Sequence, residues 1–433
     1  MKTNFQLILL GVFIFATIIG ILIFGGVIPS PFKKPAGGVG GGVVLWGPFS
    51  EQDFDVAFND FRKAHKGDFT LTYAGKDSRT LETDLVNAIA TDKGPDLVLL
   101  PYAVAIRQAD KIAPVPYKLF SLYDYDSTFV NERALYYGQE GYLSLPIVID
   151  PLVMYFNQDL LASGRLAKPP KTWSDLQTAV KNLTIADAQS NVTQSAIALG
   201  LFSNIANAKD ILSLLILQAG NPIIKVDQSD SNVVLSDSMG YPKAPADEAL
   251  AFFNRFTNPA NELYSWNSSL PEARTAFTRG NLVFYLGFAS EYSLIRKQNP
   301  QLDFGITLVP QLRQPTQTIG NLVGVSVLNK ARNAIAAPLV AKLLSTEGSR
   351  ALSKLYGLPS AKADLLGDVP KDSVATLFNQ AAIVSRNWPD PDPEKTKTIF
   401  QKMVEAVQVR GVVPSEAVRQ AEAELANLIR SKQ

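Results

Sequence analysis

The chain has 433 residues, and because a single hydrophobic core stops growing at about 250–300 residues, this length predicts at least two folding units. Lysine and arginine total 41 against 40 aspartates and glutamates, with no basic block, which argues against a nucleic-acid binder. The chain has no cysteine and a single histidine, His65, so disulfides, a lipidated cysteine and thiol catalysis are excluded and Ser-His-Asp catalysis is disfavoured.

A long apolar run near the start of the chain predicts a membrane anchor. Residues 7–28 carry no charged side chain. A helix of that length spans about 33 Å, enough to cross a bilayer core of about 30 Å. A cleaved signal peptide, the alternative, usually has a shorter apolar core of about 7–15 residues. We therefore expect a transmembrane anchor over 5–28, followed by a flexible linker over 29–42, where prolines and glycines predominate.

The first part of the body alternates strands with helices. Apolar runs and helical spacing predict, in chain order, strand 43–46, a helix capped by Ser50 and ended by Gly67, strand 69–73, helix 81–89 and strand 96–100. This βαβαβ order is typical of an open α/β sheet, whose ligands lie beyond the carboxyl ends of the strands. Phe49 and Tyr102 follow two of these strands and are therefore candidate binding residues.

The rest of the chain continues the mixed α/β pattern. Residues 146–157 are too apolar for a surface loop, and Thr172 with Asp175 has the pattern of a capping box at the start of a helix. Further predicted elements are strands 196–202, 282–286, 304–309 and 323–328 and helices 334–344, 394–409 and 415–430.

An acidic stretch near the C-terminal helices is the one pattern that suggests metal ligands. Asp390, Asp392 and Glu394 alternate with prolines, and the stretch lacks the glycine of a tight calcium loop. The sequence therefore predicts a solvated turn there, with no metal, no cofactor and no catalytic residue.

Four stretches in order along the chain carry a resemblance to a known family. They are 94–98 (GPDLV), 145–147 with 155–160 (LPI and YFNQDL), 170–176 (PKTWSDL) and 277–284 (FTRGNLVF). With these stretches the sequence resembles the family-1 extracellular solute-binding proteins of ABC transporters, the group that includes maltose-binding protein. The N-terminal anchor departs from that family, whose members usually have a cleaved signal or a lipidated cysteine.

The resemblance implies a periplasmic-binding-protein-like fold, with two α/β lobes joined by hinge strands. It places lobe one at 43–149 and 309–357 and lobe two at 150–308 and 358–433. It further implies a monomeric, non-enzymatic receptor that captures a small solute, a carbohydrate, in the cleft between the lobes and delivers it to ABC permease subunits. The bulk of the chain is then extracytoplasmic and held at the cell membrane by a single-pass helix.

Strand ends, the hinge segment and aromatic residues in loops supply the candidate binding residues. They are Phe49, Tyr102, Asp150, Ser203, Asn204, Trp266, Ser290, Glu291, Asn321 and Trp388. By resemblance, Asp150 lies where relatives place an acid that faces ligand hydroxyls. Trp388 is expected to present a stacking face to a sugar ring, because it lies on no periodic apolar stripe that would bury it.

Two other functions remain compatible with the sequence. A ligand-binding module of a sensor or chemoreceptor would have the same fold and another partner. An extracytoplasmic glycosidase would need two carboxyl groups that flank the scissile bond, and no spacing in the sequence selects such a pair.

Overall fold

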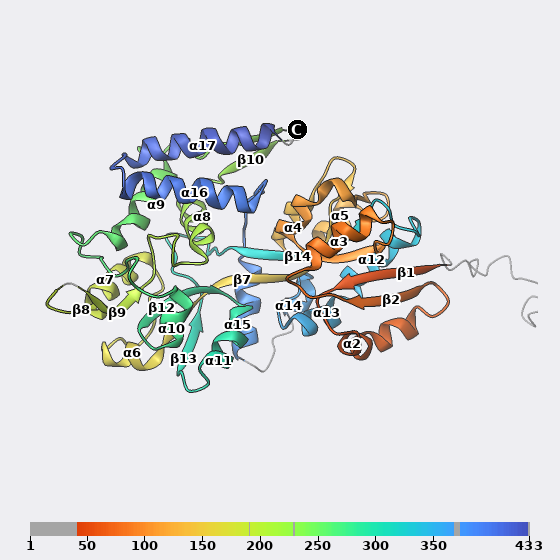
Figure 1. Cartoon of the computed structure of the whole chain (residues 1–433), viewed down its shortest axis with the longest axis horizontal. Coiled ribbons are helices and arrows are strands. Elements are labelled where there is room, and N and C mark those ends of the chain that lie inside the picture. Colours follow the sequence, from red (N-terminus) through yellow and green to blue (C-terminus); the bar gives the residue numbers. More distant parts are fainter. Residues whose placement is uncertain (1–40, 190, 228–229, 368–372, 432–433) are drawn as a thin grey trace, which may run out of the picture.

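The computed structural model describes residues 41–433 except 190, 228–229, 368–372 and 432–433. The predicted anchor over 5–28 and residues 29–40 of the predicted linker lie outside the described residues. Within the described part of the chain, no helix combines the length and the apolar character needed to cross a bilayer. Figure 1 shows an elongated body of two lobes, with the strands β7 (Leu145–Asn157) and β14 (Gly320–Leu328) passing between them.

The first lobe is built around the N-terminal strands. β1 (Gly42–Gly47) pairs in parallel with β2 (Thr70–Gly75) and with β3 (Leu97–Pro101). The helices α2 (Glu51–Ala64) and α3 (Leu81–Ala90) connect these strands, and the Ser50 hydroxyl caps α2 by accepting the backbone N–H of Asp53. The βαβαβ order predicted from the sequence is confirmed.

The second lobe has its own set of strands. β12 (Leu282–Phe288) pairs in parallel with β9 (Val192–Ile197), and β8 (Ile185–Ala186) follows at the edge. β13 (Phe304–Thr307) also belongs to this lobe. The predicted strand at 196–202 is shifted, because the chain leaves the sheet after Ile197.

Two long strands join the lobes into one continuous sheet. β7 (Leu145–Asn157) pairs with β14 (Gly320–Leu328) through its first half and with β12 and β13 through its second half. β14 in turn pairs with β3 of the first lobe. The resulting strand order is β2-β1-β3-β14-β7-β12-β9-β8, so the hinge region lies in the middle of the sheet.

A further segment, 384–388, crosses between the lobes beside these strands. The N–H of Thr318, just before β14, donates to the carbonyl of Val384 (3.2 Å), and the N–H of Arg386 donates to the carbonyl of Thr318 (2.8 Å). The Thr318 hydroxyl donates to the carbonyl of Leu152 in β7 (2.7 Å). We call β7, residues 318–320 leading into β14, and residues 384–388 the crossing segments; hydrogen bonds tie them into one unit.

Helices pack on both faces of the sheet in each lobe (Figure 1). On the first lobe these are α4 (Tyr102–Arg107), α5 (Leu122–Thr128), α12 (Ala336–Thr346), α13 (Ser349–Tyr356) and α14 (Ala363–Gly367). The others are α6 (Gln158–Ser163), α7 (Trp173–Leu183), α8 (Ala208–Ala219), α9 (Pro245–Asn254), α10 (Ala273–Thr278), α11 (Glu291–Gln298), α15 (Ser373–Ile383), α16 (Pro393–Gln408) and α17 (Pro414–Arg430). α15 packs against β7 and β13 at the junction, and α16 and α17 lie together on the second lobe.

Two predicted lobe boundaries differ from the observed contacts. Residues 309–317 bond to the second lobe, where the N–H of Trp173 donates to the carbonyl of Gln311 (3.2 Å). Residues 358–367 stay with the first lobe, since the N–H of Val130 donates to the carbonyl of Ala361 (3.0 Å). The chain therefore returns to the first lobe about ten residues after 309, and it leaves that lobe after α14 rather than at 358. The sequence did not show this, because the residues that bind these two segments lie far away along the chain.

The capping box predicted at the start of α7 supplies a test of local stability. The Thr172 hydroxyl accepts the N–H of Asp175 (3.1 Å), and the Asp175 carboxylate accepts the N–H of Thr172 (3.1 Å). We expect Thr172→Ala to lower the free energy of unfolding by about 1 kcal/mol, as measured by urea denaturation. Thr178→Ala, at an exposed position of the same helix, is the control and should change it by less than about 0.5 kcal/mol. Equal effects of the two substitutions would contradict the capping argument.

Candidate functional site

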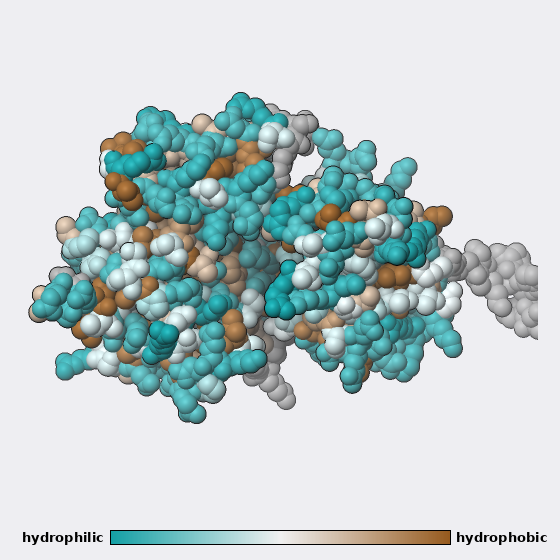
Figure 2. All heavy atoms as spheres, in the orientation of Figure 1, coloured by the Kyte–Doolittle hydropathy of each residue, from teal (hydrophilic) through white to brown (hydrophobic). Residues whose placement is uncertain are grey.

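A cavity of about 470 Å³ lies where the two lobes meet the crossing segments. The first lobe contributes Tyr102 and Tyr356, and the second contributes the beginnings of α8 and α16. The crossing segments and their neighbours contribute Asp150, Asn321 and Asn387. The space-filling view shows a hollow between the lobes with hydrophilic side chains around it (Figure 2). The cavity therefore has polar groups from both lobes and from the hinge between them.

Asp150 and Asn321 are partners in the hinge. They face each other in the register of β7 and β14. The Asp150 carboxylate accepts the N–H of Ser290 (2.9 Å), which holds it against the second lobe. Burial raises the pKa of Asp150 to about 6, although the hydrogen bonds from Ser290 act in the opposite direction. The cavity thus contains an acid that is ionised at neutral pH at some cost in stability.

A charged cluster lies at the start of α8. Lys209 donates to Asp390 at 2.7 Å, and both side chains are largely buried. Burial opposes the charge on Lys209, but Asp210 and Asp390 outweigh it and raise the pKa of the lysine. Burial also raises the pKa of Asp210, and Lys209 partly offsets this. The second lobe therefore presents both a cation and acids to the cavity.

The acidic stretch near α16 is not the solvated turn that the sequence predicts. Asp390 is 4% exposed and Asp392 is 6% exposed. Asp390 accepts hydrogen bonds from Lys209 and from the hydroxyl of Thr396 (2.7 Å), and Asp392 caps α16. The reason is tertiary: α8 brings a lysine to this segment from far away in the sequence. Among the described residues, no group of three or more His, Cys, Asp or Glu side chains is arranged to hold a metal ion.

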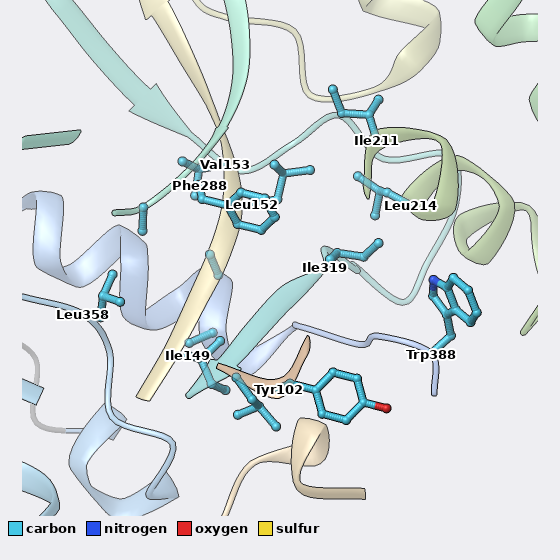
Figure 3. Close-up of a cluster of buried hydrophobic side chains, with 14 of the residues drawn as sticks. Tyr102, Ile149, Leu152, Val153, Ile211, Leu214, Phe288, Ile319, Leu358 and Trp388 are labelled. Atoms are coloured by element: carbon cyan, nitrogen blue, oxygen red, sulfur yellow. The ribbon is translucent and has the colours of Figure 1, made fainter. Parts of the chain in front are cut away.

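Trp388 lines the cavity, but its ring is mostly covered. The residue is 2% exposed, and its ring lies parallel to that of Phe400 in α16, with 6.0 Å between the ring centroids. The prediction that the ring is open for stacking, which rested on the absence of a local apolar stripe, is therefore wrong, because Phe400 of another helix covers the ring. Figure 3 shows Trp388 and Tyr102 at the same side of a buried cluster that also holds Ile319 and α8 residues Ile211 and Leu214.

Six of the ten candidate residues do not line the cavity. Trp266 is fully buried and donates its indole N–H to the side-chain oxygen of Asn204 (2.9 Å). Asn204 in turn donates to the carbonyls of Asn267 and Leu270, so both residues hold loops of the second lobe together. Ser203 is exposed outside the cavity.

The remaining three candidates, Ser290, Glu291 and Phe49, lie outside the cavity and bind or pack against other residues. Ser290 orients Asp150 through its backbone N–H. Glu291 accepts hydrogen bonds from Asn207, Tyr285 and the N–H of Phe288, so its carboxylate is fully engaged within the second lobe. Phe49 packs edge-on against Tyr356, with ring centroids 4.7 Å apart, and lines a separate groove between α2 and α13. The structure therefore brings together Tyr102, Asp150, Asn321 and Trp388 from the predicted set.

The family follows from the sequence together with this architecture. Residues 57–376 match the family of bacterial extracellular solute-binding proteins. The chain belongs to that family. No sequence among the curated proteins matches it.

Solved structures share the fold of this solute-binding protein at low sequence identity. A cyclo/maltodextrin-binding protein complexed with maltotetraose aligns with a TM-score of 0.71 at 16% identity, over 93% of this chain and 100% of its own. A cyclic α-maltosyl-1,6-maltose-binding protein from Arthrobacter globiformis aligns with a TM-score of 0.71 at 15% identity, over 90% and 99%. The sugar-binding protein MalE from Xanthomonas citri aligns with a TM-score of 0.68 at 16% identity, over 90% and 98%. These likenesses confirm the two-lobe α/β fold.

Sequence reasoning missed several cavity residues of the solute-binding protein. Lys209 and Asp210 are the only charged residues of α8, whose other residues are apolar except Ser213 and Gln218, and that contrast was a usable signal. Tyr356 ends a helix and precedes Gly357, which gave no hint of a ligand site. Asn387 reaches the cavity because its segment crosses the hinge, which no local pattern shows.

The raised pKa of Asp150 predicts a pH-dependent gain in stability when its charge is removed. The folded protein holds the pKa near 6 instead of 3.8, so stability is lost as the pH rises from about 4 to about 6, and the loss is fully present above 6. We expect Asp150→Asn to raise the free energy of unfolding of the unliganded protein by about 2 kcal/mol at pH 7. The gain should shrink towards zero at pH 4, where the carboxyl is protonated in the folded state. Urea denaturation at several pH values measures this, and a loss of stability at pH 7 would refute it.

Proposed function

We propose that this protein is the extracytoplasmic receptor of an ABC-type importer and captures a carbohydrate in the cavity between its lobes. The observation that carries the proposal is the position of the cavity: Tyr102, Asp150 and Lys209 reach it from the first lobe, the hinge and the second lobe. Ligand sites commonly lie at such domain interfaces. In a member of the extracellular solute-binding family, a small solute in this cavity can contact both lobes and the hinge at the same time.

The chemistry of the cavity favours a carbohydrate. Asp150, Asn321, Asn387 and Lys209 offer acceptors and donors for hydroxyl groups, and Tyr102 and Tyr356 offer aromatic surface for the C–H face of a ring. Structures with this fold contain maltotetraose in one case and acarbose in another, in a receptor from Streptomyces glaucescens that aligns with a TM-score of 0.64. These ligands support a sugar as the solute, with an oligosaccharide as the first probe.

Delivery and attachment complete the proposal. The receptor hands its solute to the permease subunits of the importer and has no catalytic activity of its own. Its apolar residues 7–28 hold it at the outer side of the membrane, since the chain has no cysteine to lipidate. A sensor module would bind the same solute and signal instead, and a glycosidase would convert bound maltotetraose into shorter sugars.

Binding is tested by thermal shift of the full chain against oligosaccharides, with maltotetraose first. Asn321 lines the cavity, and removing its side chain deletes a hydrogen-bonding group from the hinge. We expect Asn321→Ala to weaken the binding of the best sugar about tenfold, as measured by calorimetry. The control is Asn427→Ala, an exposed asparagine of α17 outside the cavity, which should leave affinity unchanged. No shift with any sugar would overturn the proposal, and shorter sugars in the mixture would favour a glycosidase.

Closure of the lobes is a second expectation. Groups on both lobes face the cavity, so a solute that contacts both makes more contacts when the lobes are closed and shifts the population towards that state. Small-angle X-ray scattering should show a smaller radius of gyration at saturating sugar. The Asn321→Ala protein should show the same final value at a higher sugar concentration. An unchanged radius in the saturated wild-type protein would speak against a hinge.

A further inference from the structure

A buried carboxyl group of the first lobe bonds to two of the crossing segments. Glu132 lies in the 3-10 helix Asn131–Tyr136 and is 2% exposed. One of its carboxylate oxygens accepts the N–H of Gly320 (3.2 Å), and the other accepts the N–H of Asn387 (2.8 Å). Gly320 opens β14, and Asn387 lies in the segment 384–388. One side chain thus links the first lobe to both.

These two segments carry part of the cavity wall. Asn321 follows Gly320 directly, and Trp388 follows Asn387. The Asn387 amide donates to the carbonyl of Gly320 (3.1 Å), and its side-chain oxygen accepts the N–H of Trp388 (2.9 Å). Glu132 itself does not line the cavity. Its hydrogen bonds to Gly320 and Asn387 therefore influence where the cavity-lining residues next to them lie.

Close packing leaves these segments little freedom to adjust. A Cβ atom at Gly320 would lie 2.7 Å from the Ile149 side chain and 2.7 Å from the Ser385 hydroxyl. The backbone at Gly320 is therefore in direct contact with β7 and with the neighbouring crossing segment. A shift of the chain at Gly320 or Asn387 would be transmitted to Asn321 and Trp388.

The position requires a side chain with two acceptor oxygens, although burial disfavours the charged form of a carboxyl group there. Both partners are N–H donors, and a carboxylate can accept both, whereas a carboxamide has a single oxygen and would turn its own N–H groups towards the second donor. Burial raises the pKa of Glu132 to about 8, while the N–H groups of Asn387 and Gly320 and the charge of Arg386 act in the opposite direction. Tyr102, which also faces Glu132, has its own pKa raised by burial above all. At neutral pH the group therefore carries a proton most of the time, and its two oxygens still accept both N–H groups, whereas an apolar side chain would leave both donors unpaired.

We propose that Glu132 is a positioning residue of the solute site: it fixes Gly320 and Asn387, and through them sets Asn321, Asn387 and Trp388 in the cavity wall. The inference rests on the proposed function for its meaning, but the geometry that it describes exists without solute.

A second buried carboxylate in the first lobe provides a matched control. Asp96 is 1% exposed and accepts the N–H of Val44 (2.8 Å) with one oxygen and the N–H of Asn333 (3.1 Å) with the other. All three residues belong to the first lobe, and none lines the cavity. Asp96→Asn therefore removes the same kind of bond at a site whose side-chain hydrogen bonds do not reach the crossing segments.

The experiment compares Glu132→Gln with Asp96→Asn in the full chain labelled with 5-fluorotryptophan. The chain has four tryptophans, and Trp388→Phe assigns the Trp388 resonance in the ¹⁹F NMR spectrum. We expect Glu132→Gln to shift the Trp388 resonance in the absence of solute and to weaken maltotetraose binding about tenfold. Asp96→Asn should lower the melting temperature and leave both the resonance and the affinity unchanged. A Trp388 resonance that stays in place in Glu132→Gln, or that moves equally in Asp96→Asn, overturns the proposal.

A second variant keeps the carboxyl group. Glu132→Asp retains the two acceptor oxygens, but its side chain is shorter by one methylene. Its carboxyl group therefore cannot approach the N–H groups of Gly320 and Asn387 as closely. We expect it to move the Trp388 resonance less than Glu132→Gln does, and an unchanged resonance in this variant also overturns the proposal. If the wild-type protein binds no sugar, the proposed function fails, while the ¹⁹F spectra still decide whether Glu132 sets the position of Trp388.

Discussion

The antiparallel pairing of β7 with β14 is the interaction on which the rest of the molecule depends. β14 pairs with β3 of the first lobe, and β7 pairs with β12 of the second lobe. The pairing of β7 with β14 around Asp150 and Asn321 therefore joins the strands of the two lobes into a single sheet. The segment 384–388 joins them through Thr318. Because a lost backbone hydrogen bond in a buried place is expensive, relative movement of the lobes has to bend this unit and cannot break it. Asp150, Asn321 and Asn387 of these segments line the cavity, so they give any bound solute a fixed floor.

The charged groups around that floor are held there at the expense of stability. The charges of Lys209 and Asp390 compensate each other, and the Thr396 hydroxyl donates a further hydrogen bond to the Asp390 carboxylate. Within the part of the chain that the structure describes, no cation pairs with Asp150; burial raises its pKa, and the N–H of Ser290 holds the carboxylate in place. A group that the fold keeps charged without a cationic partner is poised to gain from a hydroxyl donor. The electrostatics at Asp150 therefore favour a solute that donates hydroxyl hydrogen bonds, in agreement with the proposed carbohydrate.

The sequence predicted those parts of the molecule that depend on local pattern. The βαβαβ order, the Ser50 cap and the capping box at Thr172 follow from spacing along one element, and Tyr102 was found because it follows a buried strand. The errors concern contacts between elements. Trp388 lies on no apolar stripe of its own, yet Phe400 of α16 covers its ring. The loop position of Trp266 predicts a binding residue, but its indole N–H donates to Asn204 inside the second lobe. Whether an aromatic residue in a loop is open or covered depends on partners that the local sequence does not contain.

The same distinction separates the roles of the cavity residues in the proposed receptor. Asp150, Asn321 and Asn387 belong to segments bonded to one another, so their mutual positions are set before a solute arrives. Tyr102 and Lys209 belong to different lobes, and their separation changes when the lobes move. Contacts with the first group are equal in the open and closed states and contribute affinity without driving closure. Contacts with the second group differ between the states and alone can shift the population. A solute too short to reach both lobes should therefore bind to the floor of the cavity and leave the protein open.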